Sequence, residues 1–363
     1  MSSSAKIVTI QSLPAKLSTS SAYDFVCQAF CNRFVRDRFN VLNEYSSINW
    51  VDTVDTLPVA SSTPIADIMD ARATELIKKG SISVQWSGGV DSTALVLSLI
   101  KNGISKEDLV ICYDTNSVEE YPKLFVWFQE NGWNIKKCTD WYKELSTIDT
   151  DLITNGWCAD QLFGSVYFHN HPEFYSYSIE DFMSKGVFKD WNPSEKQIPE
   201  FAEIYKKYAK DLLGVELTTA AELGWFINFV MKWTWVSKFN DLWLLESNNK
   251  DKTQVFYNTQ EFQSWSLGNY EEINKHNIYG DDPTYYKKPL KDYCNSVFSD
   301  EYYLLNKSKK PSWNSTMNRS MYKRRFICIE TTEGFDVHNL KNAVTSDERW
   351  NTALEQIFTS IQK

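Results

Sequence analysis

The chain has 363 residues, a net charge of −9 at pH 7 and 14 tryptophans. An acidic chain lacks the positive field that holds nucleic acid, so the composition argues against a nucleic-acid partner. The longest apolar stretch, residues 223–236, contains Asn228 and Lys232. It is too short to span a bilayer, which argues against a membrane protein.

The cysteines and the first residues indicate a cytoplasmic protein. Residues 1–6 carry no apolar signal core. The seven cysteines are odd in number and mostly isolated, and Cys27 and Cys31 have no second pair to complete a zinc site. We therefore expect reduced thiols and a cytoplasmic location. The sequence does not indicate an oligomeric state.

The first 61 residues form an N-terminal extension. It contains a β-prone run at residues 6–11 and a helical pattern over 22–41, and it ends in a connection with Ser, Thr and Pro. A helix is predicted over residues 64–79, because apolar residues recur there at helical spacing.

An alternation of strands and helices predicts an α/β core over residues 62–174. The expected strands span 82–86, 108–113, 133–138 and 151–154, and the expected helices end near 102 and cover 119–131. Strands separated by helices form a parallel sheet, and ligands bind at the carboxyl ends of its strands.

The strand pattern stops near residue 175. Helical patterns over 199–213 and 218–245 predict a helical substrate lobe. This lobe and a C-terminal tail, with a helix expected at 346–361, occupy residues 175–363.

The junction between the first core strand and its helix carries the clearest chemical signal. It reads Ser-Gly-Gly-Val-Asp-Ser-Thr from Ser87 to Thr93. Two glycines let backbone N–H groups approach an anion, the hydroxyls add donors, and the positive end of the helix points to the same place. Asp91 stands where the nucleoside-triphosphate P-loop has lysine, and a carboxylate beside phosphate requires a bridging cation such as Mg²⁺.

The candidate nucleotide-binding residues are this loop and two aromatic residues at strand ends, namely Trp86, Ser87, Gly88, Gly89, Val90, Asp91, Ser92, Thr93 and Tyr113. The structural alternative is an ordinary Gly-Gly turn that Asp and Ser cap at a helix start.

A second loop follows the fourth expected strand and reads Asn-Gly-Trp-Cys-Ala-Asp-Gln-Leu-Phe-Gly from Asn155 to Gly164. It would face the first loop at the sheet edge, with Gly156 beside the nucleotide. Asp160 and Asp91 would then share a Mg²⁺ ion that neutralises pyrophosphate. Alternatively, Asp160 caps the short helix that follows.

Together the two loops resemble the ATP pyrophosphatase (PP-loop) superfamily, whose signature is Ser-Gly-Gly-x-Asp-Ser. Within it the chain is most similar to the synthetase domain of asparagine synthetase, over roughly residues 62–315. The second loop of that family reads Ser-Gly-Glu-Gly-Ser/Ala-Asp-Glu-Leu/Val-Phe-Gly-Gly-Tyr, and the matching residues here are Gly156, Ala159, Asp160, Leu162, Phe163 and Gly164.

A third stretch, Lys287-Lys288-Pro289-Leu290-Lys291, resembles the family's Lys-x-x-Leu-Arg. The resemblance places Lys287 in register with an active-site lysine and Lys288 one residue away, so both are candidate catalytic residues. Alternatively, Lys287 belongs to a solvent-exposed Lys-Lys-Pro turn. The resemblance implies an adenine nucleotide alpha hydrolase-like fold, ATP and Mg²⁺ as cofactors, and cleavage between the α and β phosphates.

The chain also departs from that family. Asparagine synthetases begin with a glutaminase domain and a nucleophilic cysteine, whereas here about 80 residues precede the loop and residue 2 is Ser2. We therefore do not expect glutamine hydrolysis. Trp157 replaces the family's catalytic glutamate, and tryptophan cannot act as a base. Cys158 and Gln161 replace a glycine and an acid. The proton acceptor has moved, with Glu144 as one alternative, or the substrate has changed.

The sequence thus predicts an AMP- and pyrophosphate-forming ligase that adenylates a small-molecule carboxylate for attack by ammonia or another amine. One alternative is a different PP-loop adenylating enzyme, acting on a nucleobase or tRNA, although the absence of a Cys-x-x-Cys motif and the acidic charge argue against it. Another alternative is a non-catalytic ATP-binding protein, for which Trp157 is the best support.

Overall fold

The computed structural model describes residues 6–10, 58–139, 144, 147–164, 172–185, 197–233, 236–237, 252–279, 286–306, 326–331 and 334–339. The chain divides into two compact units. The first, here called the sheet unit, combines residues 58–163 with 239–318, and the second combines 1–57, 164–238 and 319–363. The helices expected at 22–41 and 346–361 lie outside the described residues.

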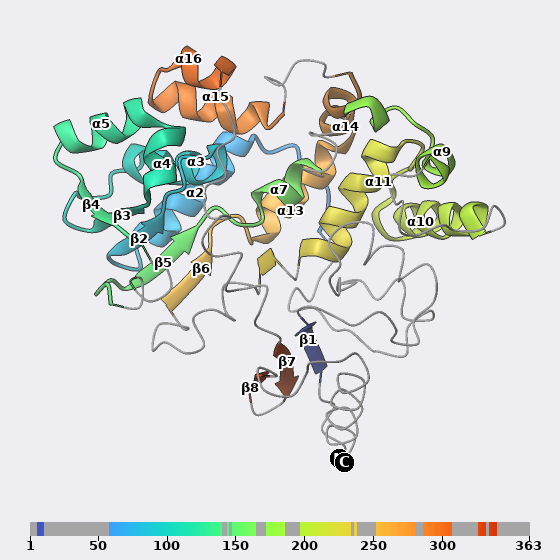
Figure 1. Cartoon of the computed structure of the whole chain (residues 1–363), viewed down its shortest axis with the longest axis horizontal. Helices are drawn as coiled ribbons and strands as arrows, with labels where there is room; N and C mark the ends of the chain where they lie inside the picture. Colours follow the sequence, from blue (N-terminus) through green and yellow to red (C-terminus); the bar gives the residue numbers. More distant parts are fainter. Residues whose placement is uncertain are drawn as a thin grey trace. The chain divides into compact units, whose positions relative to one another are not determined.

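The sheet unit is built on five parallel strands in the order β4-β3-β2-β5-β6 (Figure 1). These strands are β2 (Ile82–Gln85), β3 (Leu109–Tyr113), β4 (Asn134–Lys137), β5 (Leu152–Asn155) and β6 (Thr253–Val255). β2 and β5 are buried at every position, as central strands of a parallel sheet are. The α/β class and the parallel sheet expected from the sequence are confirmed.

The fifth strand, β6, corrects the expectation that strands end near residue 175. It pairs with β5 in parallel, with Gln254 opposite Thr154. Three residues are too few to show a periodic pattern in the sequence. β6 is a strand because it pairs with the edge of β5. The strand brings the chain that follows residue 255 to the sheet.

The buried apolar side chains of the sheet unit come from its strands and from its helices. These helices include α2 (Ile65–Ile77), α3 (Val90–Lys101), α13 (Gln260–Gly268), α14 (Tyr270–Tyr279), α15 (Lys288–Val297) and α16 (Glu301–Asn306). α3 is buried along most of its length and packs against α2, and α15 packs against both. α15 is thus fixed to the helix that begins within the Ser87–Thr93 motif.

The helix expected over 119–131 is instead two helices, α4 (Thr115–Glu120) and α5 (Pro122–Glu130). Pro122 lacks a backbone N–H and disfavours helical geometry at the preceding residue, and Tyr121 has φ −140° and ψ 69°. Asp114 caps α4, because its Oδ1 accepts the Ser117 N–H at 2.7 Å while Ser117 Oγ accepts the Asp114 N–H at 3.2 Å.

The second unit contains helices and a small antiparallel sheet. The helices include α9 (Ile179–Ser184), α10 (Gln197–Leu213) and α11 (Ala220–Ile227), and α11 continues as a π-helical turn, η3 (Asn228–Lys232). The sheet has the order β1-β7-β8, formed by β1 (Lys6–Ile10), β7 (Phe326–Thr331) and β8 (Gly334–Asn339).

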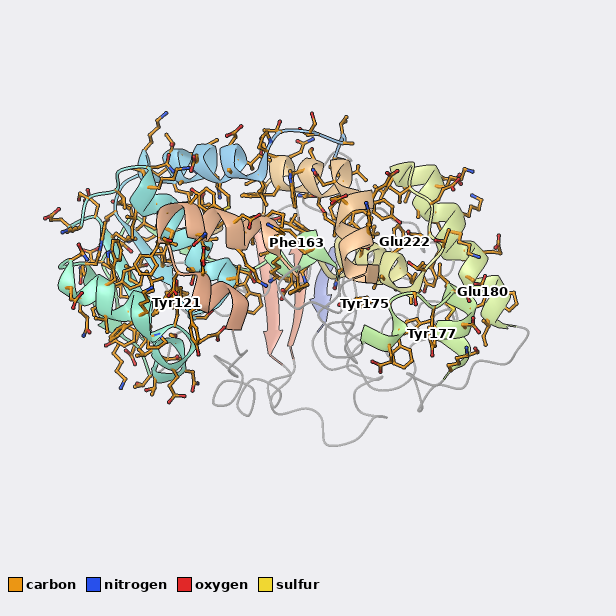
Figure 2. The ribbon with its side chains drawn as sticks, turned by 90° about the horizontal axis from the view of Figure 1, so that it is seen from above. Tyr121, Phe163, Tyr175, Tyr177, Glu180 and Glu222 are labelled. Carbon is orange, nitrogen blue, oxygen red and sulfur yellow. The ribbon has the colours of Figure 1, made fainter. Side chains whose placement is uncertain are left out.

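The start of α11 is tied to the segment before α9. The amide of Ala220 donates to the Tyr177 carbonyl oxygen at 2.9 Å. Thr219 and Glu222 form a reciprocal capping box. Figure 2 shows Tyr175, Tyr177, Glu180 and Glu222 in one region of this unit. Among the described residues, no helix has the combined length and hydropathy that a bilayer crossing requires.

The carboxylate of Asp70 links three helices of the sheet unit. It accepts hydrogen bonds from Lys101 Nζ at 2.6 Å, Asn102 Nδ2 at 2.9 Å and the Tyr293 hydroxyl at 2.5 Å. Burial tends to raise the pKa of Asp70, but the hydrogen bonds from Lys101, Tyr293 and Asn102 outweigh it and hold the pKa below its ordinary value. Asp70 therefore joins α2, the end of α3 and α15.

We predict that Asp70→Asn lowers the free energy of unfolding by about 2 kcal/mol at pH 7, the range for hydrogen bonds to charged groups. Because folding lowers this pKa, the stabilisation is present above the ordinary carboxyl pKa and is lost as pH falls through the lowered value. Urea unfolding between pH 7 and pH 3 tests this. Asp292→Asn, at an exposed position, is the control, and a difference that stays constant with pH would contradict the prediction.

Candidate functional site

The two motif loops lie where the order of the parallel sheet reverses. β2 and β5 are neighbours, with Gln85 paired to Asn155. From β2 the chain continues outward to β3 and β4, whereas from β5 it continues to β6 on the other side. In open α/β sheets such a reversal, at the carboxyl ends of the strands, is where ligands bind. Figure 1 shows α7 (Ala159–Phe163) directly beyond the carboxyl end of β5.

The first loop is held by hydrogen bonds among its own residues. The Ser92 hydroxyl oxygen accepts the Ser87 amide at 3.0 Å, and the two hydroxyls are 3.0 Å apart. The Ser87 hydroxyl also accepts the Gly89 amide at 3.3 Å. The sequence therefore supplies both the donors of the loop and the bonds that shape it.

Trp86 anchors the loop in the core. Its Nε1 donates to Thr93 Oγ1 at 3.0 Å, and its ring packs against Phe125 and Phe128. The indole is fully buried, so the ring is part of the hydrophobic core. Tyr113, the other aromatic candidate, is half-buried at the end of β3 and contacts Phe125 with ring centroids 4.7 Å apart.

Gly88 sits in a position that a side chain cannot enter. Its φ is +77°, and a Cβ there would lie 2.5 Å from the Ser117 carbonyl oxygen and 2.9 Å from Glu120 Cβ. The Tyr303 hydroxyl donates to the Gly88 carbonyl oxygen at 2.6 Å. The Cα of Gly88 is therefore enclosed by α4, and its carbonyl is bound by α16.

Tyr303 is itself fixed in place. Its ring stacks on Tyr121, which Figure 2 labels, with centroids 3.5 Å apart and an interplanar angle of 2°. Burial raises the pKa of Tyr303 well above its ordinary value. The hydroxyl therefore keeps its proton and remains a donor to the loop.

The second loop packs directly on the start of α3. A Cβ on Gly156 would lie 2.9 Å from the Ser92 amide nitrogen and 3.0 Å from the Asp91 carbonyl carbon. The Asn155 Oδ1 accepts the Trp157 amide at 3.1 Å, and Cys158 has a left-handed φ of 70°. The two loops predicted to face each other are therefore in contact at Gly156.

α7 is anchored from the opposite side by α13. The Ser266 hydroxyl donates to the Leu162 carbonyl oxygen at 2.7 Å, and the rings of Phe163 and Trp265 have centroids 5.3 Å apart. Phe163 is labelled in Figure 2. These contacts fix the short helix that carries Asp160.

The ammonium group of Lys287 lies between the two predicted metal-binding carboxylates. Its Nζ is 2.5 Å from Asp91 Oδ2, and it also forms an ion pair with Asp160 Oδ1. The lysine side chain is 7% exposed, against 24% for Asp91 and 41% for Asp160. The structure thus brings together three candidates from three distant segments. Asp91 and Asp160 are called the acidic pair below, and Lys287 is called its lysine.

The charges of the acidic pair keep this buried lysine protonated. Burial lowers the pKa of Lys287, but the negative charges of Asp160 and Asp91 and their hydrogen bonds outweigh it and raise the pKa above its ordinary value. Lys287 has a left-handed backbone, with φ 56° and ψ 29°, directly before α15. Non-glycine residues in this region are strained, and such strain gathers at functional sites.

Tyrosine hydroxyls complete the surroundings of the acidic pair. The Tyr257 hydroxyl, just beyond β6, donates to the Asp91 carbonyl oxygen at 2.9 Å, and the Tyr286 hydroxyl donates to Asp160 Oδ1 at 3.1 Å. With Tyr303 they are the residues that sequence reasoning missed. Their contacts span more than 100 residues of sequence, so no local pattern marks them.

The remaining candidates occupy different places. Val90 is buried at the first position of α3. Lys288 forms a surface ion pair with Asp292 at 2.5 Å, so the structure brings Lys287 and not Lys288 to the acidic pair. Trp157 is half-buried in the second loop. The alternative base Glu144 accepts hydrogen bonds from Thr139.

The acidic pair fits the way Mg²⁺ binds beside a polyphosphate. Within the described ranges, no three or more His, Cys, Asp or Glu side chains gather as a metal site. Mg²⁺ in nucleotide sites is held by one or two carboxylates together with substrate phosphates and water. Two carboxylates from different loops that already contact one cation are therefore a suitable protein share of such a site.

No protein-family model matches the chain, and no curated protein matches its sequence. The interpretation of the site therefore rests on the motifs and on the geometry of the acidic pair and its lysine.

We predict that Gly88→Ala costs about 2 kcal/mol more stability than Gly103→Ala, the usual range for forcing extra atoms into a packed site. Both glycines have positive φ, +77° and +87°, so both substitutions carry the same backbone strain. A Cβ at Gly103 meets nothing within 4 Å, whereas one at Gly88 clashes with backbone. Urea unfolding of the two variants measures the difference, and equal losses would show that the loop tolerates a side chain.

Proposed function

We propose that this protein is an ATP-dependent ligase that forms AMP and pyrophosphate while joining a small-molecule carboxylate to ammonia or another amine. The observation that carries the proposal is the meeting of the Ser87–Thr93 loop, the acidic pair and Lys287 at the sheet reversal. A cytoplasmic location and an adenine nucleotide alpha hydrolase-like fold belong to the same proposal.

The loop is suited to hold the polyphosphate. Its backbone N–H groups, the hydroxyls of Ser87 and Ser92 and the N-terminus of α3 supply donors and a positive dipole. The hydrogen bond of Tyr303 to the Gly88 carbonyl holds the backbone in one conformation. A loop that is ordered in advance does not lose that conformational freedom when the nucleotide binds.

Asp91 and Asp160 would hold Mg²⁺, which when bound neutralises the pyrophosphate leaving group. An oxygen of the substrate carboxylate attacks the α-phosphorus, the bond to the bridging oxygen breaks, and pyrophosphate leaves. The ammonium of Lys287 is placed to balance the negative charge that develops on the α-phosphate. The amine then attacks the acyl carbon of the adenylate, AMP departs, and the amine loses a proton.

Trp157 bears on which amine is used. The resemblance places a catalytic glutamate at this position, and an indole offers only a donor. We therefore propose a substrate other than aspartate with ammonia, with a flat or apolar part that packs on the half-buried indole.

We predict that ATP and Mg²⁺ with the right substrates yield AMP and pyrophosphate, and that Asp160→Asn lowers the rate roughly 10³-fold, more than it weakens ATP binding. Calorimetry with ATP and chromatography of the products are the measurements, with Asp292→Asn as a surface control. ADP as the main product, or no ATP binding at millimolar nucleotide with Mg²⁺, would reject the proposal. Binding without turnover on a broad panel of metabolites would favour the non-catalytic alternative.

We also predict little or no asparagine from aspartate, ATP and ammonium, even at high ammonium concentration. The reason is the missing glutamate, since the attacking amine must lose a proton. Amino-acid analysis of the reaction measures this. Trp157→Glu should retain ATP binding, because the loop of Ser87 to Ser92 holds the phosphates. Efficient asparagine synthesis by the unmodified protein would show that Trp157 is a tolerated replacement.

A further inference from the structure

Lys287 occupies the space in which a cation shared by Asp91 and Asp160 would have to lie. One ammonium group contacts Asp91 Oδ2 and Asp160 Oδ1 together. Two carboxylates this close repel each other unless a positive charge lies between them. Lys287 supplies that charge from within the chain.

A divalent cation and this ammonium cannot share the position. Mg²⁺ requires oxygen ligands at about 2.0–2.1 Å, and a second positive charge at hydrogen-bond distance from the same oxygens would repel it. We propose that Lys287 is an internal cation which a metal–nucleotide complex displaces when it binds, so that the nucleotide-free protein resists divalent metal. This inference rests on the proposed metal–nucleotide site.

This replacement of the Lys287 ammonium by a metal ion is called the exchange below. It needs a rotation of the lysine side chain and no movement of α15. The helix is fixed by Tyr293, whose hydroxyl bonds Asp70, and by the packing of α15 on α3. A lysine stem has four flexible carbons and a compact charged group, so its ammonium can leave the acidic pair while its backbone stays in place. The incoming polyphosphate offers the displaced ammonium a new negative partner.

The exchange also sets the order of binding. A lone divalent cation must remove a buried ion pair and receives no phosphate ligands in return. A metal that arrives on the nucleotide brings its own phosphate oxygens, and it leaves Lys287 a negative partner. Metal affinity should therefore depend strongly on the nucleotide in the unmodified protein.

The test is the binding of Mn²⁺, a paramagnetic probe for the Mg²⁺ position, to nucleotide-free protein by electron paramagnetic resonance. Lys287→Met removes the ammonium and keeps an unbranched side chain, and we expect it to bind Mn²⁺ at least about tenfold more tightly than the unmodified protein, because the competing charge is gone. Lys79→Met is the control for charge, because it removes the same charge beside Glu75 on the surface and should leave Mn²⁺ affinity unchanged. Equal Mn²⁺ affinities for Lys287→Met and the unmodified protein would overturn the exchange.

A double variant, Lys287→Met with Asp160→Asn, assigns the site, since it should lose the tighter binding. If Lys287→Met does not fold without metal, Mn²⁺ should restore its folding as followed by circular dichroism. Failure of Mn²⁺ to restore it would equally overturn the exchange.

Calorimetry of the unmodified protein with ATP separates this inference from the proposed function. If the unmodified protein binds ATP but Lys287→Met binds Mn²⁺ no more tightly than the unmodified protein, the exchange is rejected and the proposed function stands. Tight Mn²⁺ binding by the variant, combined with no ATP binding, would keep Lys287 as the internal cation of the acidic pair but would overturn its displacement by a nucleotide, together with the proposed function.

Discussion

Lys287 places a positive charge where water has little access, and the carboxylates of Asp91 and Asp160 compensate the cost of doing so. The compensation is mutual, because the same ammonium relieves the repulsion between the carboxylates. Each charge comes from a separate segment, so the ion pair forms only when all three segments are folded together. The acidic pair and its lysine are thus an electrostatic condition on the fold as well as the centre of the candidate site.

The parallel sheet satisfies that condition through its strand order. β2 and β5 are adjacent, and their carboxyl ends deliver the loops of Asp91 and Asp160 to one place. The third segment arrives through β6, which lies beside β5 and is followed at once by Tyr257. This short strand brings Tyr257 to Asp91, and the packing of α15 on α3 then fixes the position of Lys287.

The sequence predicts those features whose cause is local. The turn at Ser87–Thr93 follows from its glycines and hydroxyls, and four of the strands and α2 follow from the spacing of apolar residues. Pro122 is also a local signal, but the single helix expected over 119–131 overlooked it, and the structure has two helices there. The contacts of Tyr257, Tyr286 and Tyr303 have no such cause, because each hydroxyl meets a partner that only the folded chain brings near. A sequence motif predicted Lys287 as a site residue, whereas its ion pairs with both carboxylates were visible only in the structure.

The charges of the acidic pair and its lysine bear on which form of a nucleotide the proposed site accepts. Together these side chains carry one net negative charge at neutral pH, beside the Ser87–Thr93 loop that we propose as the phosphate site. A free polyphosphate would meet favourable amides and an unfavourable charge at the same time. A divalent metal on the polyphosphate would reverse the second effect, since Asp91 and Asp160 would hold it and the ammonium of Lys287 would then face phosphate oxygens. Asp91, which stands where a P-loop has lysine, and Asp160 would therefore select the metal complex, and one arrangement of three charges would govern both binding and the chemistry that follows.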